Sequence, residues 1–134
     1  MSTKDLIMTV VLIVEDDNLL LELTEMTVQE FGFETLSASN VANALSIIYS
    51  GQNIDLLFTD INLNNDRFGG CDLARKAVMY SPRLNVLYTT GNFMSPEMTS
   101  MFVKGARCLA KPYTPNQLQA ELKLILGPTK CPMF

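Results

Sequence analysis

The sequence predicts an α/β fold built on a parallel sheet that helices cover on both faces. Short, strongly apolar segments alternate along the chain with segments whose apolar residues recur at helical spacing. The most apolar segments show no alternation of polar and apolar residues, which is typical of strands buried on both faces. Strands that alternate with helices form parallel sheets, because each helix carries the chain back to the edge where the previous strand began.

The length and composition fit one folded domain. The chain has 134 residues, of which 48% are hydrophobic, so it can bury a compact core and is too apolar to be disordered. We expect a single domain over residues 1–134, with its core at about 9–126 and a short tail at 127–134. The net charge is −4 and no block of Lys and Arg occurs, so we expect no direct binding to nucleic acid.

Five segments are expected to form strands. The first and third read TVVLIV and IDLLFT, and their β-branched and apolar content predicts buried strands. The second and fifth are short, and the fourth reads NVLYTT. The five expected strands are 9–14, 34–38, 54–59, 85–90 and 107–110.

Five helices are expected between and after these strands, and each has a recognisable start or stop. Gly32 ends the first, Asn40 caps the second, Ser81-Pro82 ends the third, and Ser95-Pro96 opens the fourth. Thr114 and Gln117 form a capping box that opens the last helix, and Gly127-Pro128 stops it. The five expected helices are 17–31, 41–49, 71–80, 96–103 and 115–126.

Polar residues follow the expected strands at the edge where open α/β sheets bind ligands. Taken singly, each has an ordinary structural interpretation: an Asp after a strand commonly caps a helix, and a lone Lys is commonly a solvated surface residue. Taken together and in order, they predict one shared site. These residues are Glu15, Asp16, Asp17, Asp60, Thr90 and Lys111.

The predicted cluster of carboxylates would either shift the pKa values of its members or need a cation. Two carboxylates about 4 Å apart repel by roughly 4 kcal/mol at an effective dielectric constant near 20. One lysine supplies less positive charge than the cluster needs, and Mg²⁺ is the divalent ion that typically binds one or two carboxylates and keeps several waters. A carboxylate, a metal ion, a lysine and a threonine hydroxyl at one point favour phosphoryl chemistry with an aspartyl phosphate.

Four motifs, in this order, resemble the receiver domain of two-component response regulators. They are VLIVEDD (11–17), LLFTDINL (56–63), VLYTTG (86–91) and GARCLAKPY (105–113). The resemblance extends from about residue 9 to residue 126. It implies a doubly wound, flavodoxin-like sheet of five parallel strands in the order 2-1-3-4-5, with five helices.

The resemblance also implies roles for individual residues. Asp60 matches the phosphoacceptor, and Glu15 and Asp16 match the acidic pair that holds Mg²⁺. Asp16 would bind the ion directly and Glu15 mainly through water, while Asn62 would offer its backbone carbonyl. Asp17 follows the pair and is a weaker candidate.

Two further residues match the catalytic set of the family. Thr90 matches the switch hydroxyl that hydrogen-bonds the phosphoryl group, and Lys111 matches the lysine that pairs with that group. The family pattern also implies that the peptide bond between Lys111 and Pro112 is cis.

Three positions depart from the family pattern. Cys108 stands where the family usually has an aromatic residue that couples the switch threonine to the partner-binding face. Asn64 stands where a proline is common, and the loop 62–70 is about two residues longer than usual. Other aromatic residues that could take the missing role are Tyr88, Phe93 and Tyr113.

These observations predict a phosphoacceptor protein and not a dedicated enzyme. It would take a phosphoryl group from a histidine kinase or a histidine phosphotransfer protein, and it would slowly dephosphorylate itself. It would then act as a phosphate relay or sink, or contact a downstream protein through the fourth helix, fifth strand and fifth helix. A receiver cut from a longer protein would give the same sequence pattern.

Two alternatives belong to other functional classes. One is a pseudo-receiver that works as an interaction module without phosphorylation, which the departure at Cys108 keeps open and the full set of site residues disfavours. The other is a hydrolase of the haloacid-dehalogenase type. That family needs the pattern D-x-D-x-T after its first strand, and VEDDNLL does not supply it.

We expect a soluble cytoplasmic protein without membrane insertion. Cys71, Cys108 and Cys131 form no C-x-x-C pair and the chain has no His, so reduced thiols are the simplest interpretation. The apolar run 6–14 is too short to span a bilayer and is followed by acidic residues instead of a cleavage site.

Overall fold

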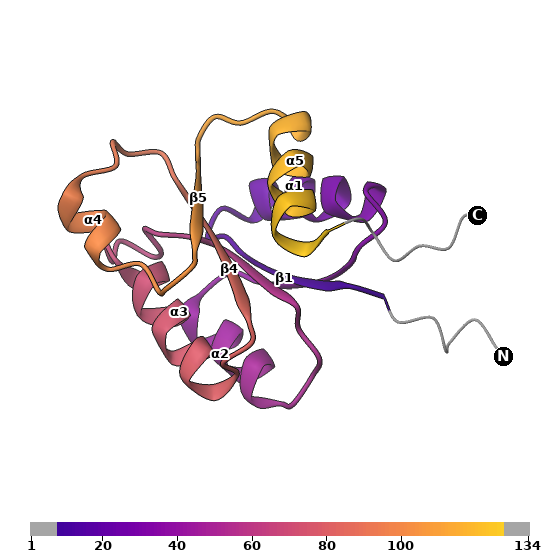
Figure 1. Cartoon of the computed structure of the whole chain (residues 1–134), viewed down its shortest axis with the longest axis horizontal. Helices are drawn as coiled ribbons and strands as arrows, with labels where there is room; N and C mark the ends of the chain where they lie inside the picture. Colours follow the sequence, from indigo (N-terminus) through magenta and orange to yellow (C-terminus); the bar gives the residue numbers. More distant parts are fainter. Residues whose placement is uncertain (1–7, 128–134) are drawn as a thin grey trace, which may run out of the picture.

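The computed structural model describes residues 8–127 and contains one parallel sheet of five strands. The strand order is β2-β1-β3-β4-β5, so the predicted fold and order are confirmed (Figure 1). The expected tail and Cys131 lie outside the described residues, apart from Gly127. The strands are β1 (Val10–Val14), β2 (Glu34–Ala38), β3 (Leu56–Asp60), β4 (Asn85–Thr90) and β5 (Arg107–Ala110).

The helices form a layer on each side of the sheet. Figure 1 shows α1 and α5 together on one face, and α2 and α3 on the other. Among residues 8–127, no helix has the length and apolar content needed to cross a membrane. The helices are α1 (Asn18–Glu30), α2 (Val41–Tyr49), α3 (Gly69–Tyr80), α4 (Pro96–Ser100) and α5 (Pro115–Leu126).

The predicted helix starts and stops are largely confirmed. The capping box of Thr114 and Gln117 opens α5, and Asn40 caps α2. The prediction for α4 was wrong at its end, because the helix stops at Ser100 and not near Val103. Beyond this point the Val103 N–H donates a hydrogen bond to the Tyr88 hydroxyl, at 3.1 Å, so a tertiary contact takes the place of further helical bonding.

The sheet separates two apolar layers that fix the central strands. All residues of β1 and β3 are buried, as the absence of alternation predicted. Leu57 faces the layer under α2 and α3, whereas Phe58 faces the layer under α1 and α5. Burial of each such side chain stabilises the fold by about 1.5–3 kcal/mol. The strand that ends in Asp60 is therefore held from both sides.

Candidate functional site

The carboxyl ends of four strands meet at one edge of the sheet and form a polar cavity of about 270 Å³. Asp60 is the last residue of β3 and Thr90 the last of β4. Glu15 and Asp16 come directly after β1, and Lys111 directly after β5. All five line the cavity, so the structure brings together the residues that the sequence predicted at this edge.

Lys111 joins the ends of three strands by ion pairs. Its Nζ lies 2.8 Å from Asp60 Oδ1 and 3.0 Å from Glu15 Oε1. Asp60 and Glu15 are only 5% and 6% exposed, so these pairs are shielded from water on the carboxylate side. Charge-assisted hydrogen bonds are stronger in such surroundings than at an open surface.

The carboxylates form a group with the chemistry of a magnesium site. Glu15, Asp16 and Asp60 each offer an oxygen, and these three oxygens lie within 4.8 Å of one another. With all three ionised, the single positive charge of Lys111 leaves two negative charges uncompensated, which suits a divalent ion with oxygen ligands. Asn62 lines the same cavity as these three carboxylates.

The excess negative charge and the burial both act on Asp60. Desolvation, with the neighbouring Glu15 carboxylate, raises the pKa of Asp60 to about 7, against the opposing pull of Lys111. Burial alone lowers the pKa of Lys111, but its bonds to the two carboxylates outweigh this and the net pKa is raised. Asp60 is thus costly to ionise in the absence of a cation, while Lys111 stays charged.

Thr90 presents a hydroxyl to the cavity. Its Oγ1 accepts a hydrogen bond from the Asn92 N–H at 3.0 Å, and in the described part of the chain it donates to no acceptor. The Thr89 hydroxyl instead donates to the Leu109 carbonyl at 2.7 Å and so links β4 to β5. The Thr90 hydroxyl proton is therefore available to an oxygen bound beside Asp60.

Asp17 has a structural role in this arrangement. It lies at the rim of the cavity, but its Oδ1 accepts hydrogen bonds from the N–H groups of Leu19 and Leu20, at 3.0 and 3.2 Å. It is the N-cap of α1, and it does not belong to the group of converging carboxylates.

The loop after β3 contains a tight turn at Asn64 and Asn65, where the Asn-Asn-Asp run of the sequence is turn-prone. Leu63 and Asp66 pair as an antiparallel bridge, with hydrogen bonds of 3.1 and 2.9 Å in the two directions. Asn64 and Asn65 have φ of 52° and 66°, as a type I′ turn requires, and Asn tolerates this conformation well. The Asn64 N–H donates to Asp16 Oδ2 at 2.8 Å. The Asn-Asn pair was the available sequence signal for the turn.

A glycine allows α3 to approach the end of β3. The Gly70 N–H donates to the Ile61 carbonyl at 2.7 Å, which holds the first turn of α3 against the end of β3. A Cβ added at Gly70 would lie 1.8 Å from the carbonyl oxygen of Asp60. Only glycine fits there without displacing the backbone of Asp60.

Tyr88 supplies aromatic volume next to Cys108. The two residues are partners in the register of β4 and β5, and both belong to the layer under α2 and α3. The Tyr88 ring is fully buried and lies 4.4 Å from the Phe102 ring, centroid to centroid. Of the other candidates, Phe93 is 89% exposed and Tyr113 packs near Phe58 on the opposite face of the sheet.

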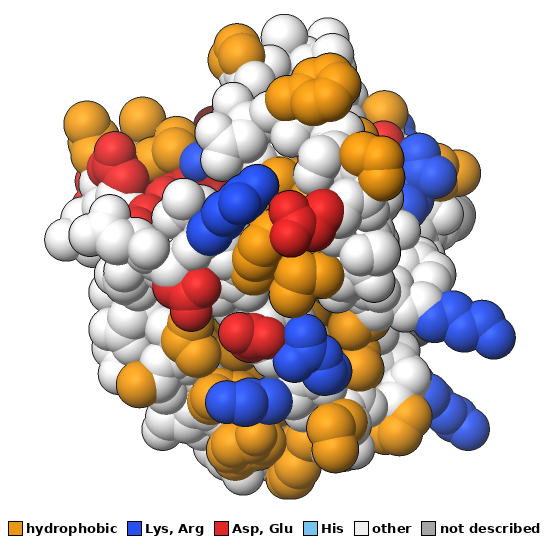
Figure 2. Space-filling model, turned by 90° about the vertical axis from the view of Figure 1, so that its left-hand side faces the viewer, with side chains coloured by type: hydrophobic (Ala, Val, Ile, Leu, Met, Phe, Trp, Pro, Cys, Tyr) orange, Lys and Arg blue, Asp and Glu red, His pale blue; other side chains and the backbone are white. Residues whose placement is uncertain are grey.

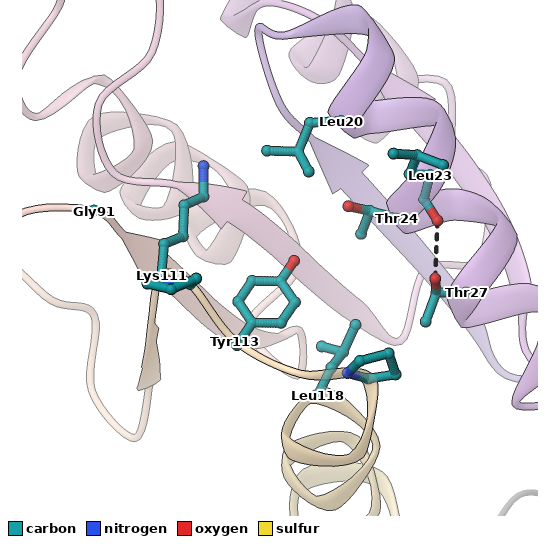
Figure 3. A pocket seen from close by; sticks show the side chains of 10 residues that line it. Leu20, Leu23, Thr24, Thr27, Gly91, Lys111, Tyr113 and Leu118 are labelled. Carbon is teal, nitrogen blue, oxygen red and sulfur yellow. Dashed lines mark hydrogen bonds between the residues drawn. The ribbon is translucent and has the colours of Figure 1, made fainter.

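An apolar groove of about 520 Å³ opens beside the polar cavity. Figure 3 shows it between α1 and the start of α5, with Lys111 at one end and the Tyr113 hydroxyl pointing toward Thr24. Leu20, Gly91 and Lys111 line both the groove and the polar cavity, so the two are continuous. Sequence reasoning missed this groove, because it is formed by segments far apart in the chain.

The chain matches the family described as response regulator receiver domain over residues 11–123. It also resembles the crystal structure of a response regulator receiver protein from Sinorhizobium medicae WSM419, with 29% identity, a TM-score of 0.81, and coverage of 89% of this chain and 94% of that chain. A CheY-like receiver domain protein from Methanospirillum hungatei JF-1 gives 27% identity and a TM-score of 0.79, over 88% and 93% of the two chains.

A third similar structure is the chemotaxis protein CheY4 of Vibrio cholerae, with 25% identity and a TM-score of 0.80, over 90% of this chain and all of that chain. Because the family match covers most of the chain, the protein belongs to the response regulator receiver domain family. The Lys111–Pro112 peptide bond is cis, as the resemblance implied.

Proposed function

We propose that this receiver domain accepts a phosphoryl group on Asp60 from a phosphohistidine, with Mg²⁺ as cofactor. The observation that carries the proposal is the position of the buried Asp60 carboxylate, 2.8 Å from Lys111 and within the group of three converging carboxylates. The donor would be a histidine kinase or a histidine phosphotransfer protein.

The proposed transfer is balanced by the groups at the cavity. An Asp60 carboxylate oxygen attacks phosphorus and forms an acyl phosphate. The P–N bond to the donor imidazole breaks, and its electron pair returns to the ring nitrogen. Lys111 Nζ and the Thr90 hydroxyl would hydrogen-bond the transferred oxygens and so stabilise the charge that develops there; the pairing of Lys111 with Asp60 and the Thr90 hydroxyl proton, which has no acceptor among residues 8–127, support these roles.

Four residues would hold the cation. Glu15, Asp16 and Asp60 offer carboxylate oxygens, and Asn62 offers its backbone carbonyl. When bound, Mg²⁺ supplies charge neutralisation that lets two anionic groups approach each other. Its charge also favours the ionised form of Asp60, whose pKa is raised in its absence.

The apolar groove is where we expect the phosphodonor protein to dock. Continuity with the polar cavity means that a helix packed in the groove would lie next to Lys111 and Asp60. Leu23 lines the groove and is 51% exposed, so it offers apolar surface to such a partner.

We place the downstream contact on the α4–β5–α5 surface. Figure 2 shows the side of the molecule that carries α4, where hydrophobic side chains are interspersed with charges of both signs. The proposal includes a single receiver domain in the cytoplasm that acts as a relay, a phosphate sink or an effector.

Acetyl phosphate tests the phosphoacceptor assignment. With Mg²⁺ present, we expect the mass of the native protein to rise by one phosphoryl group, and the Asp60→Asn variant to stay unlabelled. Asp17→Asn is the matched control, because it removes one charge at the cavity rim and keeps a capping residue. Labelling that survives in Asp60→Asn would contradict the site assignment, and an unreactive native protein would favour the pseudo-receiver alternative.

A second comparison tests the donor surface. Leu23→Glu places a charge in the groove, so we expect it to slow transfer from a histidine phosphotransfer protein at least tenfold while labelling by acetyl phosphate stays at the native rate. Leu124→Glu is the control, since Leu124 is also exposed, at 63%, and does not line the groove. Equal transfer rates for both variants would contradict the proposed docking.

A further inference from the structure

The turn of residues 63–66 is anchored to the fold at both ends. Leu63 is only 1% exposed and belongs to the apolar layer under α2 and α3. At the other end, Asp66 Oδ1 accepts from the Phe68 N–H at 3.2 Å, and the Asp66 carbonyl accepts from the Gly69 N–H at 3.1 Å. The turn is thus tied to the core and to the start of α3.

Within residues 8–127, this turn supplies the one hydrogen bond that holds the Asp16 carboxylate. Glu15 is bonded by Lys111 and by the Asp17 N–H, and Asp60 is paired with Lys111. Asp16 is exposed, and in the described part of the chain its carboxylate accepts one hydrogen bond, from the Asn64 N–H at 2.8 Å. Without that donor, no hydrogen bond or ion pair within residues 8–127 would hold the Asp16 carboxylate.

The same turn restrains the carbonyl of Asn62. On the preceding side, the Ile61 carbonyl accepts a hydrogen bond from the Gly70 N–H at 2.7 Å. On the following side, the Leu63 N–H donates to the Asp66 carbonyl at 3.1 Å. The peptide units that flank Asn62 are therefore both fixed.

We infer that the turn of residues 63–66 is a positioning element of the cation site, which raises the affinity for Mg²⁺ by preorganising Asp16 and the Asn62 carbonyl. The inference rests on the proposed function, since it takes these two residues as ligands. A ligand that is already held in place loses less conformational entropy when the ion binds. Loss of groups that orient metal ligands typically weakens metal affinity about 10- to 100-fold.

Two double variants isolate the turn from its side chains. Asn64→Val/Asn65→Val and Asn64→Gly/Asn65→Gly both remove the two amide side chains. Valine strongly disfavours the positive φ of this turn, whereas glycine adopts it freely. We expect the Val variant to bind Mg²⁺ about tenfold more weakly than the native protein, and the Gly variant to stay within about twofold.

The affinity is measured by titrating Mg²⁺ without a phosphodonor, and metal-free melting temperatures show whether each variant is folded. Equal affinity in all three proteins would overturn the inference. Equal weakening in both variants would also overturn it, because the loss would then come from the side chains.

Nuclear magnetic resonance gives a readout that does not depend on either double variant. In the metal-free native protein, the Asn64 amide proton should resonate downfield, because it is bonded to a carboxylate. Asp16→Ala should move that resonance upfield, and an unchanged resonance would contradict the contact on which the inference depends.

Phosphorylation at saturating Mg²⁺ separates this inference from the proposed function. We expect the Val variant to approach the native extent of labelling by acetyl phosphate once the ion is saturating. A native protein that binds Mg²⁺ but is never labelled would contradict phospho-acceptance and leave the role of the turn standing.

Discussion

Replacement of Gly70 by alanine should disturb both the stability of the fold and the backbone at Asp60. The added Cβ would lie 1.8 Å from the Asp60 carbonyl oxygen, 2.8 Å from the Asp60 carbonyl carbon and 2.9 Å from the Ile61 Cα. These are backbone atoms at the end of β3 and directly after it, so no flexible side chain can move aside. The start of α3 must shift away from β3, and the Gly70 hydrogen bond to Ile61 must lengthen or break.

The size of the effect follows from three contributions. Overpacking of a tight interior costs about 1–3 kcal/mol. Loss of the buried hydrogen bond costs about 1–3 kcal/mol. Alanine recovers about 0.5–1 kcal/mol through its higher helix propensity. We therefore expect the free energy of unfolding to fall by about 3 kcal/mol, which corresponds to roughly 10 °C in melting temperature for a chain of this size.

Gly69→Ala is the control for this prediction, because its Cβ would meet only side-chain atoms of Asp66 and Leu63, at 3.3–3.4 Å. We expect it to change the stability by less than about 1 kcal/mol. Urea unfolding of the metal-free proteins measures both free energies, and labelling by acetyl phosphate should be slower in Gly70→Ala alone. Equal stability of the two variants would refute the argument from close approach.

Three further results are expected. Because burial raises the pKa of Asp60 from 3.8 to about 7, metal-free stability should fall as the pH rises between these values, since the folded protein then holds a proton that the unfolded chain has lost. Asp60→Asn should lack this fall and be more stable than the native protein above pH 7, by at most about 4 kcal/mol; parallel pH profiles in urea unfolding would contradict this. Tyr88→Phe should cost about 1 kcal/mol in the same assay, because the Val103 N–H loses its acceptor, whereas Tyr49→Phe, at an exposed position, should change nothing. Asp16→Ala should weaken Mg²⁺ binding in a calorimetric titration, and unchanged affinity would count against Asp16 as a ligand.

The order of the elements could be predicted because local patterns report it. Unbroken apolar runs specified β1 and β3, and the capping residues specified where α2 and α5 begin. The end of α4 could not be predicted in this way. The hydrogen bond from the Val103 N–H to the Tyr88 hydroxyl joins residues that are 15 positions apart, and no local sequence pattern predicts it.

The convergence of the site was also predictable, because the carboxyl ends of parallel strands share one edge of the sheet. Glu15, Asp16, Asp60, Thr90 and Lys111 line one cavity, as their positions after the strands indicated. The sequence could not separate a helix cap from a cation ligand among adjacent acids, and only the backbone geometry assigned the capping role to Asp17.

The sequence by itself determined which elements form, in what order, and which polar residues reach the edge of the sheet, because these depend on periodicity and on position within a strand. The tertiary structure decided how that edge is held. Gly70 allows α3 to reach the end of β3, and the Asn64 N–H bonds to the Asp16 carboxylate from a turn 48 residues away. Both contacts depend on the distance between backbone segments in space, a quantity that local sequence patterns do not encode.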